Sequence, residues 1–163
     1  ASFLAYVQYL SWYLVYLRCP LQIVAHLEGV EIDPPELPEP VETPWSAAHG
    51  ALVDRIAGFD RSDPFAAYEF EASERLAVYL QRADRFGPAL EDANTDEAAE
   101  LLGVRPADPT SRDAALEALV VANEGDLDAR LLTYFVRRLL RHEFLIEPVA
   151  AELEGARMQV ISP

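Results

Sequence analysis

The sequence of 163 residues contains no lysine, and all 13 of its side-chain cations apart from histidine are arginine. Without lysine the chain can form neither a Schiff base with a carbonyl substrate nor a phosphate-binding loop of the Walker type. Arginine suits two-pronged contacts with carboxylate and phosphate groups. Compositional bias or salt adaptation of the source organism explains the same preference, and we favour that explanation.

Cysteine and glycine are also scarce. The one cysteine, Cys19, excludes an intrachain disulfide and a metal site of paired cysteines, and its apolar surroundings before a proline suit an inert thiol. The seven glycines are scattered where helices are expected to end, so no glycine-rich phosphate loop is present. No serine stands in the GxSxG pattern of a nucleophile elbow.

Positive charge is in short supply overall, because 28 acidic residues against 13 arginines give a net charge of −15. Proteins that bind phosphate backbones present basic surface, so we expect no nucleic-acid partner. The single cysteine suits a reducing compartment, and the first residues, ASF, lack the basic start of a signal peptide. We therefore expect a cytoplasmic protein.

Apolar residues recur every three or four positions through most of the chain, and no long stretch alternates as a strand would. This pattern predicts an all-α, single-domain helical bundle of about five main helices over residues 1–163. An aromatic N-terminal helical segment covers 1–29, an acidic proline-rich connector covers 31–44, and the helical bundle covers 44–163.

Residues that begin or end helices set the expected boundaries. Thr43-Pro44 and Asp63-Pro64 are typical helix starts, and Gly87-Pro88 is a typical stop. Asn94 with Glu97 and Thr110 with Asp113 resemble capping boxes. The first expected helix after the connector is 44–59, with Trp45, Ala48, Leu52 and Ile56 on one face. The others are 64–86, a short one at 98–102, 111–123, and 127–146 ending near Pro148, with a short helix at 148–155 and coil or strand after it.

The connector 31–44, EIDPPELPEPVETP, has five prolines and five acidic residues. Prolines remove amide donors and fix φ, so the segment is expected to be extended. A ligand for an SH3-like domain is one interpretation of this composition. We favour a stiff strap across the protein surface, with Ile32, Leu37 and Val41 packed onto it.

The N-terminal helical segment, FLAYVQYLSWYLVYL at 3–17, carries an unusual aromatic pattern. Tyr6, Tyr9, Tyr13 and Tyr16 share one side of a helix, next to a second row of Phe3, Val7, Leu10, Leu14 and Leu17, and only Gln8, Ser11 and Arg18 mark a polar edge. The segment is too short and too rich in tyrosine to span a membrane. A central core helix and a helix at a membrane surface are possible interpretations. We favour a leucine side facing the core and a tyrosine side, with Trp12, that contacts a protein partner or a second copy.

Arginines concentrate on the last long helix, where the sequence contains Arg130, Arg137, Arg138, Arg141 and His142. In a chain of net charge −15, this helix is the place to expect an anionic ligand or an acidic partner. Internal pairing with the many acidic residues, including those of the connector, is the simpler interpretation, and we favour it.

No residue pattern indicates a metal, a cofactor or a catalytic group. His26, His49 and His142 lack the HxxxH or ExxH spacing that puts two ligands on one helix face. Glu69, Glu71 and Glu74 cluster on one expected helix, and Glu71 stands four residues before Arg75, a spacing typical of an ion pair on a solvated helix face. We therefore predict no catalytic, cofactor-binding or metal-binding residue, although an enzyme is not excluded.

Two short stretches, WSAAHGALVDRIA at 45–57 and GARMQVISP at 155–163, are faintly similar to parts of the small helical γ chain of soluble methane-type monooxygenase hydroxylases. The similarity covers a small part of the chain and assigns no family, but it favours an accessory subunit. Our first hypothesis is a non-enzymatic interaction protein, an accessory subunit or assembly factor. The alternative is a small helical enzyme or ligand-binding protein whose inter-helix pocket, lined by tyrosine and arginine, holds an anionic molecule. A third option, an acidic inhibitor that covers a basic partner, is the weakest.

Overall fold

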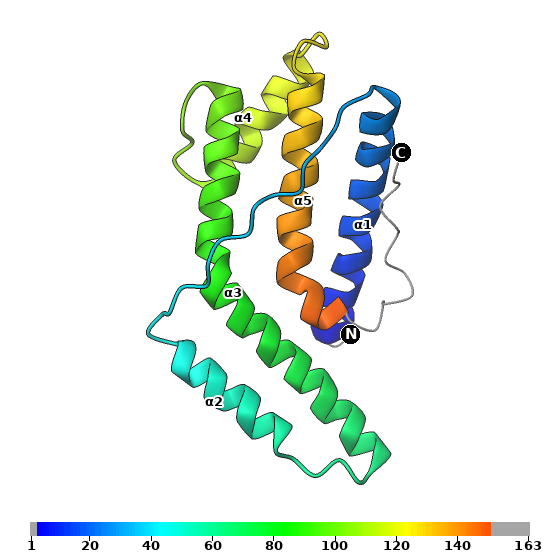
Figure 1. Ribbon diagram of the computed structural model, residues 1–163, viewed down its shortest axis with the longest axis vertical. Coiled ribbons are helices and arrows are strands. Elements are labelled where there is room, and N and C mark those ends of the chain that lie inside the picture. Colours follow the sequence, from blue (N-terminus) through cyan, green and yellow to red (C-terminus); the bar gives the residue numbers. More distant parts are fainter. Residues whose placement is uncertain (1–2, 151–163) are drawn as a thin grey trace. The chain divides into compact units, whose positions relative to one another are not determined.

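The structure, a computed structural model, describes the backbone of residues 3–150 and the side chains of residues 9–150. This part of the chain is all-α, with five helices and no strand (Figure 1). The helices are α1 (Phe3–Leu27), α2 (Ser46–Ala57), α3 (Pro64–Leu102), α4 (Pro109–Ala122) and α5 (Asp128–Ala150). The all-α prediction is thus confirmed. The part of the predicted C-terminal helix and tail from residue 151 onward lies outside the described residues.

The chain divides into two compact units, each assembled from separate stretches of sequence. Of the described residues, unit 1 comprises 3–15, Glu39–Gly87 and 143–150, and unit 2 comprises Tyr16–Pro38 and Pro88–His142. The helices α1, α3 and α5 therefore each belong to unit 1 at one end and to unit 2 at the other. The prediction of a single domain stays a prediction.

Pro20, Pro88 and Pro148 lie inside helices, and the last two stand where the sequence predicted a helix stop. α3 runs on through Gly87-Pro88, α5 continues past Pro148, and α1 continues past Pro20. A proline within a helix removes one amide donor, a local cost that packing of the rest of the helix offsets. After Pro88 the α3 residues Leu90, Asn94 and Ala98 are buried at four-residue intervals. The predicted stop at Gly87 is therefore wrong, and so is the capping box at Asn94, which lies in mid-helix.

Other helix boundaries follow local hydrogen bonds. The Asp63 carboxylate accepts the Ala66 amide proton at 2.9 Å, so the predicted start of α3 is confirmed. α4 is capped by Asp108, whose Oδ1 accepts the Ser111 amide proton at 2.8 Å, rather than by Thr110. α2 begins two residues after Pro44, because the Thr43 hydroxyl accepts the Trp45 amide proton in a turn before the helix.

The core of unit 2 lies where α3, α4 and α5 meet. Ala98, Leu116 and Tyr134 are each at most 2% exposed and come one from each helix. The partly buried side chains of Leu101, Leu102 and Phe135 pack around them. Burial of this apolar surface is the main stabilising term for the unit.

In unit 1, α2 meets α3 through its small and polar side. Ser46 is buried and its hydroxyl donates to Asp84, and a Cβ placed on Gly50 would lie 3.9 Å from the Gln81 side chain. The face that the sequence placed around Trp45 and Leu52 is largely exposed, with Trp45 at 66% and Leu52 at 42%. Small residues let two helices approach closely, which explains why the contact uses this side.

The connector between α1 and α2 is extended, as predicted, and its end is fixed to α3 within unit 1. The Val41 amide donates to the Arg85 carbonyl at 3.1 Å, Glu42 pairs with Arg85 at 2.8 Å, and the Thr43 hydroxyl donates to Asp84 at 2.5 Å. Ile32 is half-buried, but Leu37 and Val41 are 46% and 55% exposed, so the expected packing of these two is wrong.

Candidate functional site

α1 buries polar side chains and exposes aromatic ones. Ser11, Leu14, Arg18 and Ala25 are each at most 7% exposed and recur at helical spacing, so they define the inward side of the helix. The Arg18 guanidinium donates to the Gln22 side chain at 2.5 Å. The polar edge expected at Ser11 and Arg18 is therefore not a solvent edge but part of the buried side.

The opposite side of α1 carries an aromatic face made of Tyr9, Trp12, Tyr13 and Tyr16. These side chains are 71%, 39%, 51% and 68% exposed. Tyr6 belongs to the same row, but its side chain lies outside the described residues. Leu14 faces inward as expected for the leucine row, whereas Leu17 is 41% exposed and joins the outer side.

The exposed side of α1 continues toward its C-terminus with Ile23, Val24 and Leu27, which are 43%, 44% and 75% exposed. Despite this apolar surface, no helix in the described part of the chain is long and apolar enough to cross a membrane. Large contiguous apolar patches on monomeric proteins are rare and usually mark interaction sites.

The arginines of α5 are held by acidic groups and carbonyls of the neighbouring helices in unit 2. Arg141, 2% exposed, donates to the Asn94 side-chain oxygen Oδ1 at 2.9 Å and to Glu97 at 3.0 Å, and Arg137 pairs with the same Glu97 carboxylate at 3.2 Å. Arg130 donates to the main-chain carbonyl oxygen of Glu100 at 2.8 Å, and Arg138 donates to the Asp113 carboxylate at 2.9 Å. Their partners lie on α3 and α4, not on the connector, whose Glu42 pairs with Arg85.

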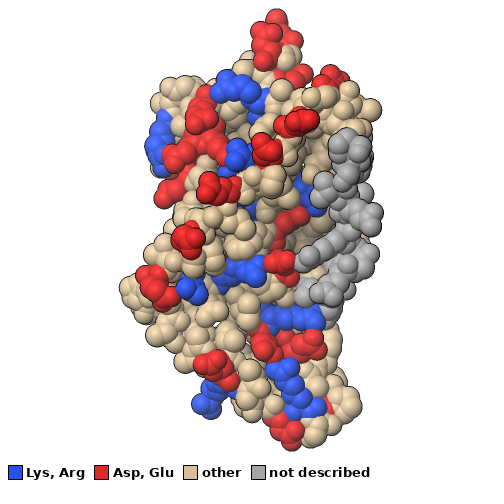
Figure 2. Space-filling model, in the orientation of Figure 1, with Lys and Arg blue, Asp and Glu red and all other residues tan. Residues whose placement is uncertain are grey.

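A second group of charges, the ionic cluster of Glu91, Arg112, Asp113 and Arg138, joins α3, α4 and α5. Arg112 is 2% exposed and donates to Glu91 at 2.6 Å and to Asp113 at 3.0 Å. No pattern in the sequence indicated this cluster, because most of its members are far apart in the chain and adjacent only after folding. Red acidic and blue arginine side chains lie next to one another over much of the face in Figure 2.

Burial and charge shift four pKa values around this cluster. Burial lowers the pKa of His142, and the positive charge of Arg138 lowers it further. Burial raises the pKa of the Tyr134 phenol, against the nearby arginines. Burial would raise the pKa of Asp113 and lower that of Arg112, but their mutual hydrogen bond and those to Arg138 and Glu91 reverse both shifts. Perturbed groups gather at functional sites but also in structural ion-pair networks.

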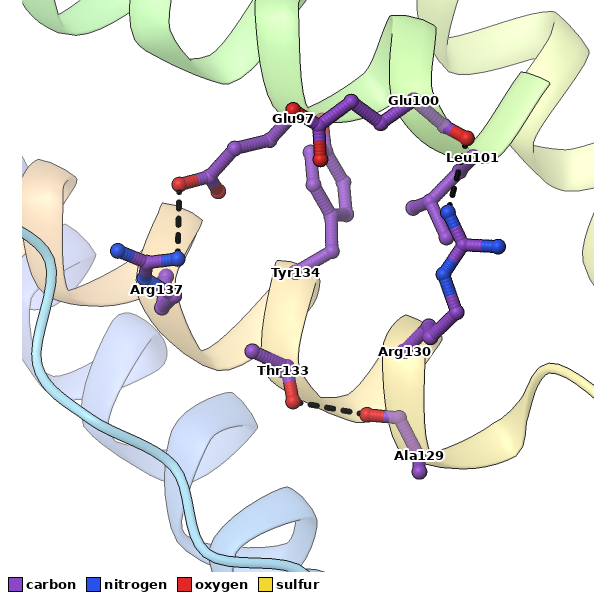
Figure 3. A pocket seen from close by; sticks show the side chains of 8 residues that line it. All are labelled: Glu97, Glu100, Leu101, Ala129, Arg130, Thr133, Tyr134 and Arg137. Carbon is purple, nitrogen blue, oxygen red and sulfur yellow. Dashed lines mark hydrogen bonds and ion pairs between the residues drawn. The ribbon is translucent and has the colours of Figure 1, made fainter. Parts of the chain in front are cut away.

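Beside the core of unit 2 lies an open cavity of about 290 Å³ between α3 and α5. Figure 3 shows Arg130 and Arg137 at its two ends and Tyr134 and Thr133 between them, with Glu97 and Glu100 opposite on α3. Arg130 bonds to a main-chain carbonyl, whereas Arg137 pairs with the Glu97 carboxylate. Apart from this pairing, the cavity offers polar groups of both signs to a small ligand.

The three histidines do not come together. His26 is exposed, while His49 and His142 are half-buried in different units. Within residues 9–150, no group of three or more histidine, cysteine or carboxylate side chains is placed to hold a metal ion. Cys19 is half-buried and unbridged.

Neither a protein-family model, nor a curated protein, nor a solved structure matches the chain.

Proposed function

We propose that the protein is a non-enzymatic helical interaction protein, an accessory subunit or assembly factor of a larger complex, and that it contacts its partner through the aromatic face of α1. One observation carries the proposal: the helix turns Ser11 and Arg18 inward while Tyr9, Tyr13 and Tyr16 are 51% to 71% exposed. A surface helix of a protein that acts as a monomer turns its polar residues to solvent and its large apolar residues to the core.

The free energy available from this face is of the size that a complex requires. A tyrosine buries roughly 150–250 Å² when covered, so these three, at 51% to 71% exposure, leave roughly 300–500 Å² of side chain in water. At about 25 cal/mol per Å² their burial contributes roughly 7–12 kcal/mol before costs. Association costs about 4–15 kcal/mol, so the neighbouring apolar residues of α1 have to contribute as well.

Other exposed side chains favour a subunit over a free-standing monomer. Trp45, which precedes α2, and Phe65 of α3, both in unit 1, are 66% and 74% exposed. Aromatic side chains are enriched in protein interfaces. They support a protein whose surface is covered at further places in its working state.

The proposal is tested by charge insertion into the aromatic face with a matched control elsewhere. Tyr13→Arg places a cation on a side chain that is 51% exposed, and Tyr68→Arg does so at 53% exposure on α3. Sedimentation velocity and affinity purification from the native organism would be compared for both. Loss of association in Tyr13→Arg alone is expected, and equal behaviour of both variants and wild type would contradict the proposal.

A second candidate function rests on the cavity in unit 2, where Arg130, Arg137 and Tyr134 line about 290 Å³. An anionic small molecule held between the two arginines would make this a ligand-binding protein or a small enzyme. Calorimetric titration with dicarboxylates and phosphate esters tests it. Arg130→Gln should abolish any binding that Arg105→Gln, a change of an exposed arginine outside the cavity, leaves intact.

A further inference from the structure

The C-terminal half of α1 and the start of the connector follow one another directly in the chain and belong to unit 2. α1 ends at Leu27, and Gly29, with φ of 69°, turns the chain. The Val30 amide donates to the Ala25 carbonyl at 2.8 Å and the Gly29 amide to the His26 carbonyl at 3.2 Å, a pair of bonds that fixes the exit of the chain from the helix. The connector therefore starts in a defined direction from the end of α1.

The helical part of this surface is an apolar stripe made of Tyr16, Ile23, Val24 and Leu27. Their spacing of seven, eight and eleven residues from Tyr16 places all four on one side of the helix. They are 68%, 43%, 44% and 75% exposed. The one arginine in this part of the helix, Arg18, is buried on the other side, so the stripe itself carries no charge.

The residue after α1 and the start of the connector carry an acidic edge made of Glu28, Glu31, Asp33 and Glu36. All four side chains are exposed, and none makes a hydrogen bond or ion pair with another residue of the described chain. No arginine occurs between Arg18 and Arg55. The acidic edge therefore differs from Glu91, Glu97 and the other acidic residues of unit 2 whose charge is balanced by arginines of α4 and α5.

We propose that the apolar stripe and the acidic edge together dock a protein partner that presents an apolar ridge bordered by arginine or lysine. This inference rests on the proposed function and specifies the chemistry of the partner. The stripe supplies the desolvated centre of the interface and the acidic edge its charged rim. Rim charges of opposite sign accelerate association and select the partner.

Charge favours a basic protein partner over a second copy of the chain and over a membrane surface. A second copy would bring two acidic edges and two chains of net charge −15 together, so like charges oppose it. An anionic membrane surface is repelled for the same reason, since amphipathic helices that bind membranes carry basic residues beside their apolar side. A basic rim on the partner is the complement that these side chains lack.

The probes are two synthetic helical peptides with the same leucine ridge, one flanked by arginine and one by glutamate. Binding to the intact chain of 163 residues is measured by fluorescence anisotropy at low salt, about 50 mM NaCl, and at about 500 mM NaCl. We expect binding of the arginine peptide, at least about tenfold weaker at the higher salt, and no binding of the glutamate peptide. Equal affinity for both peptides, or affinity without salt dependence, would overturn the charge complementarity.

Matched variants separate the acidic edge from net charge. The edge variant carries Glu28→Gln, Glu31→Gln, Asp33→Asn and Glu36→Gln, and the control neutralises four exposed acidic residues elsewhere, with Glu69→Gln, Glu117→Gln, Glu124→Gln and Asp126→Asn. We expect the edge variant to bind the arginine peptide at least about tenfold more weakly than the control does. Equal binding by the two would overturn the role of the edge.

The apolar stripe is tested separately, so that failure of this inference is distinguishable from failure of the proposed function. Leu27→Arg should abolish peptide binding, and circular dichroism confirms that it folds. If Tyr13→Arg disrupts association but the edge variant binds like its control, the proposed function stands and the basic-partner inference falls. A dimer that Leu27→Arg dissociates, or binding of wild type to phosphatidylglycerol vesicles, would assign the stripe to another occupant and overturn the inference.

Discussion

Tyr16 and Arg18 lie two residues apart in α1 and point to opposite sides of the helix, the tyrosine 68% exposed and the arginine 7% exposed. A helix with an aromatic outer side and an arginine on its inner side is the reverse of the ordinary amphipathic arrangement. The Arg18 guanidinium donates a hydrogen bond to the Gln22 side chain. The burial pattern thus supports the proposal that the outer side of α1 contacts a partner and is not simply a solvent-exposed helix face.

The buried pairing of Arg141 predicts a strong effect on stability. Arg141→Ala would remove the donor of the buried Asn94 side-chain oxygen and one of the two arginines that pair with Glu97 in unit 2. Removing one partner of a buried ion pair costs about 3–5 kcal/mol. Urea unfolding should show a loss of this size, whereas Arg130→Ala, at an exposed position, should cost less than about 1 kcal/mol. Similar losses in both variants would contradict the assignment.

At Tyr134, unlike Arg141, removal of the polar group is expected to cost no stability. Its ring is buried in the core of unit 2, and its hydroxyl, though beside Arg138, makes no hydrogen bond of good geometry with the described residues. An unsatisfied buried polar group costs about 1–3 kcal/mol. Tyr134→Phe should therefore leave the free energy of unfolding unchanged or raise it. A loss above about 1 kcal/mol would show that the hydroxyl has a partner.

The lowered pKa of His142 predicts a loss of stability in mild acid. The groups that face it are Arg138 of α5, Glu91 of α3, and Arg112 and Asp113 of α4. Burial keeps the folded imidazole neutral, while the unfolded chain takes up a proton near its ordinary pKa of about 6.5. The stability that the neutral His142 side chain contributes is therefore fully present above about pH 6.5, and it is lost as the pH falls through the pKa of the folded state.

The measurement is the free energy of unfolding between about pH 7 and about pH 5, the range around the ordinary histidine pKa. His142→Gln should flatten the decline in this range, and His26→Gln, at an exposed position, should not. The lowered pKa of Asp113 also makes stability depend on pH, because its carboxylate stabilises the fold above about pH 4 and this stabilisation is lost in stronger acid. The measured pH range lies above that loss, so Asp113 does not contribute to the decline. An unchanged slope in His142→Gln would contradict the prediction.

Two glycines should respond to alanine with opposite signs. Gly29 has φ of 69°, a conformation that strains any other residue, so Gly29→Ala should destabilise by about 1 kcal/mol. Gly87 lies inside α3, and no atom of a neighbouring helix lies within 4 Å of the place that an added methyl group would take, so Gly87→Ala should stabilise by about 0.5–1 kcal/mol. Thermal unfolding of the two variants tests both signs, and a destabilised Gly87→Ala would mean that α3 is not helical there.

The sequence was sufficient for the helical class, which follows from spacing along the chain. Spacing also placed the tyrosines on one side of α1, but it left open whether that side faces the core or a partner. It failed where contacts between distant residues decide. Pro88 reads locally as a helix stop, but the burial of Leu90 and Asn94 carries α3 through it. No sequence pattern near Arg112 predicts its bond to Glu91, which lies 21 residues earlier on another helix.

The apolar side of α2 shows the same limit from another direction. Periodicity identified a face containing Trp45 and Leu52, but it could not say whether that face meets this chain or another one. In unit 1 the helix packs through Ser46 and Gly50 instead, and the apolar side remains exposed.

Site-specific photo-crosslinking in the native organism tests the central claim most directly. A benzoyl-phenylalanine in place of Tyr13 or Tyr16, on the aromatic face, should give a light-dependent covalent product with a protein partner, and the same replacement of Tyr68 should not. Crosslinks from the Tyr68 position with none from the other two would contradict the claim that α1 makes the contact.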